Sequence, residues 1–270
     1  MPAPLSSKKS DFAPYVVLTG RRSAFVGQGF DFGPQRNAVA TIVVGLDHPV
    51  RLTDTGDTVG QPRRSGWVQS HEGDRAGALV VLPPESSGRL VVEGRVAMLF
   101  SDPLVDDLSR IAIDAPSLAV QRVREALMQG PGRGGRPFLD PIFRMLEVGE
   151  RRPRRADIAR VVQAMSASPE RFDRLTAAAD LAGLSPARFR HVFADVVGLT
   201  FTRFRQWRRM GAVVRQMAEG RPLTDAAHVA GFAGSAHLAT AFRAMFGLSP
   251  SQLTTAGTRY VLDAPPIAVG

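Results

Sequence analysis

Side chains that carry several hydrogen-bond donors follow an Ala-Gly pair in two stretches of this chain. Arg190 and His191 follow the Ala182-Gly183 pair, and His237 follows the Ala230-Gly231 pair. A guanidinium can bond guanine O6 and N7 in a bidentate way, and an imidazole can donate to a base or a phosphate. Such bonds require rigid elements that hold these side chains against the acceptor groups.

The two stretches are copies of one unit. Residues 175–179 match residues 223–227 at an offset of 48, and beyond the glycine the offset becomes 49, which pairs Phe189 with Leu238 and Phe193 with Phe242. A match that survives an inserted residue and ends at a shared Gly-Leu-Thr/Ser is too ordered for chance composition. We therefore interpret residues 175–197 and 223–246 as an internal repeat.

Each copy predicts a short helix, a tight glycine turn and a second helix. The expected N-caps of the first helices are Thr176 and Thr224, because a hydroxyl accepts from the free amides of the first turn. Each first helix ends at a left-handed glycine, Gly183 or Gly231. The second helices are expected to begin at two further serine caps, Ser185 (followed by Pro186) and Ser235.

The second helices carry apolar residues at i, i+3, i+4 and i+7, namely Phe189, Val192, Phe193 and Val196, and Leu238, Ala241, Phe242 and Met245. Helix, glycine turn and helix with an inner apolar stripe is the sequence form of a helix-turn-helix. A pair of helical hairpins that only pack would share these features. Two copies on a basic background favour DNA binding.

Residues 201–220 predict one long helix between the copies, with an apolar stripe and an end at Gly220-Arg221-Pro222. About eighteen residues at 1.5 Å rise give a strut of roughly 27 Å. Such a strut holds two recognition helices near one turn of DNA, about 34 Å, apart. The geometry predicts contacts in two consecutive major grooves.

The net charge of +9 lies entirely in the repeat half. Residues 1–150 contain 17 basic and 17 acidic side chains, whereas residues 151–270 contain 17 basic and 8 acidic ones. A surface that binds phosphates requires such an excess of positive charge.

Residues 155–256 resemble the DNA-binding domain of the AraC/XylS family of bacterial transcription regulators. The resemblance rests on the two Leu-Thr-x-Ala-Ala starts, on Gly183-Leu184-Ser185, on Ala230-Gly231-Phe232, and on the closing Phe246-Gly247-Leu248-Ser249-Pro250. It implies a sequence-specific regulator with one recognition helix in each of two successive major grooves.

The resemblance also implies which residues contact DNA. The expected base contacts are exposed positions early in each recognition helix: Ala187, Arg190, His191, Ser235, Ala236, His237, Ala239 and Thr240. The candidate phosphate contacts are Thr176, Arg188, Arg203, Arg205, Arg208, Arg209, Thr224 and Arg243. Because the second recognition helix has few long polar side chains, the first is expected to dominate discrimination.

The first half of the chain is a different domain. Short strand-like runs at residues 15–18, 39–44, 78–82, 90–92 and 96–100 predict a small β-sandwich or barrel. Residues 104–111, 118–128 and 141–147 are expected to be helical. The fold class is thus α+β multidomain, with a β-sandwich or barrel that carries helices at 1–130, a linker at 131–154 and the all-α domain at 155–256. The resemblance to the AraC/XylS family implies that the first domain is a cupin-like effector or dimerisation domain.

Neither a metal site nor a nucleophilic triad follows from the spacings. His48 and His71 are isolated, and the strand before Pro83-Pro84 is followed by Glu85 rather than by a histidine. We therefore expect no catalytic residue, no metal and no cofactor. A barrel that binds a small molecule without metal, or that only mediates dimerisation, stays open.

The chain has no cysteine, which excludes disulfides and thiol-based redox sensing. No N-terminal signal or apolar run of membrane-spanning length occurs, so we expect a cytoplasmic protein without a membrane partner. The expected partner is an operator in double-stranded DNA. RNA polymerase, an unidentified small-molecule effector and a second copy of the chain are candidate partners. The alternative function is a DNA-associated enzyme or adaptor whose N-terminal domain is catalytic or a protein-interaction module.

Overall fold

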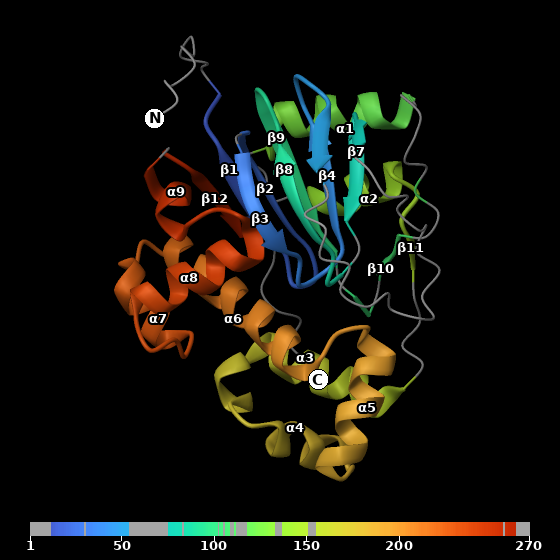
Figure 1. Cartoon of the computed structure of the whole chain (residues 1–270), viewed down its shortest axis with the longest axis vertical. Coiled ribbons are helices and arrows are strands. Elements are labelled where there is room, and N and C mark those ends of the chain that lie inside the picture. Colours follow the sequence, from blue (N-terminus) through green and yellow to red (C-terminus); the bar gives the residue numbers. More distant parts are fainter. Residues whose placement is uncertain are drawn as a thin grey trace.

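The computed structural model shows a two-layer β-domain that packs directly against a bundle of helices (Figure 1). It describes residues 12–29, 31–53, 75–82, 84–101, 103–104, 106–108, 111, 118–132, 137–150, 155–255 and 257–262. The sequence prediction of a β-rich first half followed by an all-α domain is confirmed, and the strand at Arg259–Leu262 beyond that domain was not predicted. Trp67 and His71 lie outside the described residues.

Two sheets form the β-domain. The first has the order β12-β1-β2-β9-β4-β7 and the second the order β3-β8-β5-β6. Their strands are β1 Tyr15–Leu18, β2 Ser23–Gln28, β3 Asp31–Arg36, β4 Thr41–Gly45, β5 Val50–Thr53, β6 Arg75–Gly77, β7 Leu79–Leu82, β8 Ser87–Val91, β9 Arg95–Phe100 and β12 Arg259–Leu262. All five strand-like runs of the sequence correspond to strands, namely β1, β4, β7, β8 and β9.

Both faces of the larger sheet are buried, and alternate residues serve different cores. On β9, Val96, Met98 and Phe100 pack into the cluster that contains the inner sheet face and the helical domain, whereas Ala97 and Leu99 pack on the opposite side. Successive side chains of a strand point to opposite faces, which explains this division. A sheet buried on both sides requires near-continuous apolar strands, as the sequence has.

Helices α1 (Leu118–Gln129) and α2 (Leu139–Met145) cover the outer face of this sheet (Figure 1). Both helices were predicted from the sequence and are confirmed, although α2 begins two residues earlier than expected. The helix expected at 104–111 is wrong, because the described part of that segment forms a turn and strand β10 (Asp106–Asp107), which pairs with β11 (Gly149–Glu150). The carboxylate of the buried Asp106 accepts a hydrogen bond from the Arg22 guanidinium, and the extended conformation of β10 allows this contact. Both α2 and β11 fall within residues 131–154, the segment predicted to be a linker.

The helical domain contains α3 Ala156–Ala167, a 3-10 turn at Pro169–Phe172, α4 Leu175–Ala182, α5 Pro186–Val197, α6 Phe201–Ala218, α7 Leu223–Val229, α8 Ser235–Phe246 and α9 Pro250–Thr255. Helices α4 and α5 form one helix-turn-helix unit, α7 and α8 the other, and α6 joins them. The long connecting helix and both units therefore lie where the repeat predicted them.

The glycine turns follow the prediction, but the caps follow it only in part. Gly183 and Gly231 have φ values of 67° and 77°, and the Ser185 hydroxyl accepts from the Arg188 amide at 3.4 Å. The expected caps Thr176 and Thr224 are wrong, because the helices begin one residue earlier, at Leu175 and Leu223. Ser235 is not a cap either, since Gly234 occupies that position and Ser235 is the first helical residue.

The two domains share one hydrophobic core rather than meeting through a loose linker. Residues of β1, β3 and β9 belong to the same buried cluster as residues of α6 and α8. At the end of α8, a Cβ atom placed on Gly247 would lie 2.1 Å from the Phe32 carbonyl oxygen of β3. Beyond α9 the chain returns to the first sheet, where β12 pairs in parallel with β1. The second helix-turn-helix unit is thus attached to the β-domain at several points.

Two equivalent glycines test this attachment. Gly198 and Gly247 end α5 and α8 with φ values of 77° and 71°, but a Cβ on Gly198 meets no atom within 4 Å. We expect Gly198→Ala to cost about 1–2 kcal/mol for left-handed alanine, and Gly247→Ala to cost at least twice as much because the methyl group meets the Phe32 backbone. Chemical denaturation of both variants measures this. Equal losses would mean that α8 does not press on β3 in solution.

The serine pair tests the capping assignment. Ser185→Ala removes a hydroxyl that accepts from a first-turn amide, and we expect it to lower the free energy of unfolding by about 1 kcal/mol. Ser235→Ala should change it by less than about 0.5 kcal/mol, because no cap is lost. Thermal or urea unfolding of both variants is sufficient, and a larger loss for Ser235→Ala would contradict the assignment.

Candidate nucleic-acid interface

The first recognition helix presents its predicted base-reading side chains to solvent. Ala187, Arg190 and His191 are exposed, while Phe189 and Phe193 on the opposite side are fully buried against the domain core. Phe189 packs at 5.8 Å between ring centroids on Phe201 of α6. Because the aromatic stripe fixes the rotation of α5, the arginine and histidine face away from the protein.

The second recognition helix presents a smaller and less charged surface. Ala236, His237 and Thr240 are exposed, and Ser235 and Ala239 are half-buried. The Ala233 amide donates to Nδ1 of His237 at 3.4 Å, and the imidazole lies edge-on to Phe232 at 5.5 Å. His237 therefore braces the turn with one nitrogen, which leaves Nε2 available for a base or a phosphate.

Four of the candidate phosphate-contacting residues are exposed: Thr176, Arg188, Thr224 and Arg243. Thr176 and Thr224 occupy equivalent places in the first turns of α4 and α7. Helix N-termini favour anions because their first amides lack helical partners. Both threonines are thus suited to phosphate contact although neither acts as a cap.

The other four candidates, all on α6, already make contacts within the protein. Arg203 donates to Glu85 at 3.0 Å and to the Arg36 carbonyl at 2.7 Å, which links α6 to the β-domain. Arg205 donates to the Asp173 carbonyl. The Arg208 guanidinium lies 4.8 Å from the centre of the Phe204 ring.

Arg209 packs on the turn of the second unit. It donates to the Gly231 carbonyl at 3.3 Å, and a Cβ on Gly231 would lie 3.1 Å from its guanidinium carbon. Burial, together with the charge of Arg205, lowers the pKa of Arg209 below its ordinary value. The arginine therefore contributes to the shape of the turn.

No local pattern in the sequence predicts the contact between Arg203 and Glu85. Glu85 lies in the turn between β7 and β8, at a φ of 62°, and bonds Arg36 of β3 as well as Arg203. These partners are far apart in the chain, and a carboxylate in a turn is ordinarily a solvated one. Only the packing of the two domains brings them together.

Among the described residues, no group of three or more histidines, cysteines or acidic residues is placed to hold a metal ion. None of the described helices is long and apolar enough to cross a membrane.

Comparison with known proteins agrees with this geometry. A family model described as a helix-turn-helix domain matches residues 178–256, which span most of α4 to the end of α9. No curated protein matches the chain. The overall fold is similar to that of ToxT from Vibrio cholerae.

Three ToxT structures document the similarity of fold. A structure with a bound unsaturated fatty acid has a TM-score of 0.57 at 12% identity, covering 93% of this chain and 98% of ToxT. An apo structure of a ToxT variant has a TM-score of 0.56 at 12% identity, covering 87% and 97%. A structure bound to a methylnaphthalenyl butenoic acid has a TM-score of 0.54 at 10% identity, covering 86% and 97%.

The family match covers both helix-turn-helix units, and on each unit most of the predicted base-contacting residues are exposed. Residues 178–256 therefore form an AraC-type helix-turn-helix domain, which makes this chain a DNA-binding transcription regulator.

Proposed function

We propose that the chain binds an asymmetric operator, with α5 and α8 in successive major grooves on one face of the duplex. The observation that carries this proposal is the pair of exposed recognition-helix faces joined by the continuous helix α6. Two half-sites about one helical turn apart match a strut of roughly 27 Å plus the width of the flanking helices. A chain with two reading units binds such a site as a monomer.

Arg190 is the main base-reading residue in this proposal. It is exposed, lies one turn into α5, and carries the fork of donors that guanine accepts. His191 and Ala187 stand beside it. On α8, Ala236, Ala239 and Thr240 offer methyl groups, while Ser235 and His237 offer polar contacts. Thr176, Arg188, Thr224 and Arg243 hold phosphates and fix the register.

The β-domain modulates DNA binding through its contacts with α6 and α8. Gly247 lies against β3, and Arg203 bonds Glu85, so a change in the β-domain reaches both the connecting helix and the second recognition helix. The ligand-bound ToxT structures support a small-molecule effector for this chain as well. The proposal also includes contact with RNA polymerase. A homodimer formed through the first half is a further part of it, although one chain is sufficient to occupy the operator. Such a regulator acts in the bacterial cytoplasm and catalyses no reaction.

In-vitro selection of duplexes with the full-length protein tests the proposal. We expect two short recurring blocks about ten base pairs apart. Arg190→Ala should cost about 1–3 kcal/mol at one position of one block and relax the preference there. Arg51→Ala is the control, because Arg51 is exposed on β5 and lies outside the helical domain. Uniform weakening of all sequences by Arg190→Ala would contradict base readout.

Salt titrations separate phosphate contacts from internal contacts. Arg188→Ala should reduce the slope of log affinity against log salt by about 0.9, the value for one lost phosphate contact. Arg203→Ala should leave the slope nearly unchanged, because Arg203 bonds Glu85 and the Arg36 carbonyl. Fluorescence anisotropy on the selected duplex measures both slopes. An unchanged slope for Arg188→Ala would remove that residue from the phosphate surface.

A further inference from the structure

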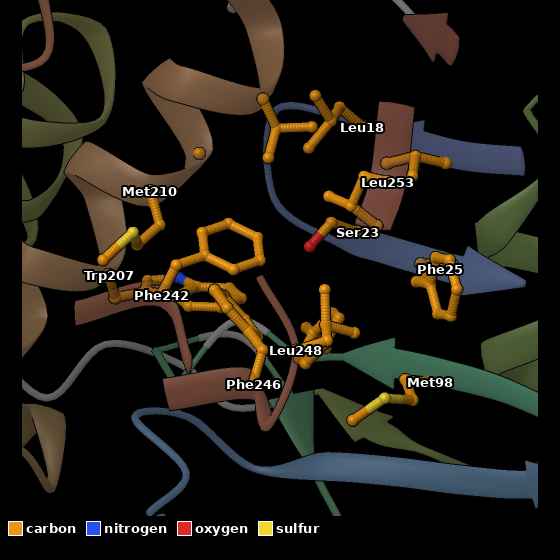
Figure 2. A pocket seen from close by; sticks show the side chains of 15 residues that line it. Leu18, Ser23, Phe25, Met98, Trp207, Met210, Phe242, Phe246, Leu248 and Leu253 are labelled. Atoms are coloured by element: carbon orange, nitrogen blue, oxygen red, sulfur yellow. The ribbon is translucent and has the colours of Figure 1, made fainter. Parts of the chain in front are cut away.

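The β-domain and the helical domain enclose an apolar pocket between them (Figure 2). Its walls come from β1, β2 and β9 on one side and from α6, α8 and α9 on the other. The empty space amounts to about 540 Å³, part of it open to solvent.

Aromatic rings from three elements form one wall of the pocket. Phe100 of β9 lies 5.4 Å from Trp207 of α6 and 5.5 Å from Phe246 of α8, and Trp207 lies 5.8 Å from Phe246. Figure 2 shows the Trp207, Phe242 and Phe246 side chains gathered on the side opposite β2. Such rings offer a large, rigid and apolar contact surface.

The residues that line the pocket carry almost no polar atoms. Ser23 supplies the one hydroxyl and Trp207 the one ring nitrogen, and no charged side chain is among the described residues of the lining. A carboxylate buried here would lose its hydration without gaining a cationic partner, which is strongly unfavourable. The lining therefore selects against an anionic head group inside the pocket.

A glycine keeps the pocket open from the side of α6. Gly211 lies in the interior of this helix, lines the pocket, and would find no atom within 4 Å of an added Cβ. Glycine is among the poorest helix formers, so its place in an otherwise continuous helix lowers helix stability. A larger residue at this position would project into the empty space.

From these observations we propose that the pocket binds an uncharged apolar molecule, with its single polar group, where present, at Ser23. The ligand contacts Phe242 and Phe246 on the inner side of α8 and Met98 and Phe100 of the sheet at once. Its binding holds the second recognition helix in a fixed orientation to the β-domain. The regulatory consequence rests on the proposed DNA-binding function, whereas the binding itself rests on the pocket alone.

A matched pair of probes tests the ligand class. Decanol and decanoate share a chain length, and decanoate is ionised at pH 8. In the full-length Trp67→Phe protein, Trp207 is the remaining tryptophan and lies in the pocket wall. We expect decanol to shift the emission of Trp207 and to raise the melting temperature with concentration, and decanoate to bind at least tenfold more weakly. Equal or tighter binding of decanoate overturns the proposal.

Variants of the lining identify the site. Gly211→Leu should abolish decanol binding, whereas Gly211→Ala should retain most of it and raise the melting temperature of the free protein by roughly 2 °C through better helix propensity. Ser23→Val narrows the pocket from β2 without changing α6, and should weaken decanol at least fivefold. Unaltered decanol binding by both Gly211→Leu and Ser23→Val overturns the assignment, as does unaltered binding by Ser23→Val if Gly211→Leu fails to fold.

These readouts contain no DNA, so the two proposals fail separately. A protein that selects an operator but does not bind decanol contradicts the ligand proposal and leaves the regulator function in place. A protein that binds decanol but selects no sequence contradicts the regulator function and leaves the pocket in place.

Discussion

The rest of the structure depends on one constraint, which is the burial of one side of α6 and α8 against the inner face of the larger sheet. It joins the two domains in one hydrophobic cluster, in which the rings of Phe100, Trp207 and Phe246 pack against one another. A linked pair of independent domains would expose these rings to water. Because they are buried, the orientation of the second recognition helix is set by the β-domain as well as by its own helix-turn-helix unit.

The two reading units consequently differ in their freedom. Helix α5 is held by Phe189, Phe193 and Phe201, all within the helical domain. Helix α8 is held in addition by β3 behind Gly247 and by the pocket lining. We infer that the first unit supplies most of the sequence discrimination and that the second supplies the connection to the effector domain. The charge asymmetry between the two recognition helices is consistent with this division.

The sequence predicted the elements best where one local rule decides the structure. The repeat located both helix-turn-helix units, because left-handed glycines and apolar stripes act within a few residues. It missed β3, whose Gly33 and Pro34 resemble a turn. The structure tolerates Pro34 because β3 is an edge strand with an irregular register between Asp31 and Pro34. The caps predicted at Thr176, Thr224 and Ser235 failed because the N-cap position lies one or two residues before each of these hydroxyls.

Contacts between distant segments could not be predicted from the sequence. Nothing local to Arg203 indicates Glu85 as its partner, and nothing local to Gly211 indicates an open space beside α6. Of the candidate site residues on α5 and α8, all except the half-buried Ser235 and Ala239 are exposed as expected, whereas the arginines on α6 lie among internal partners. One hydroxyl-radical footprint of the full-length protein on its selected duplex tests the central claim. If α5 and α8 occupy successive major grooves, two protected patches lie about ten base pairs apart on one face of the DNA. A single patch, or protection spread evenly around the helix, would contradict this arrangement.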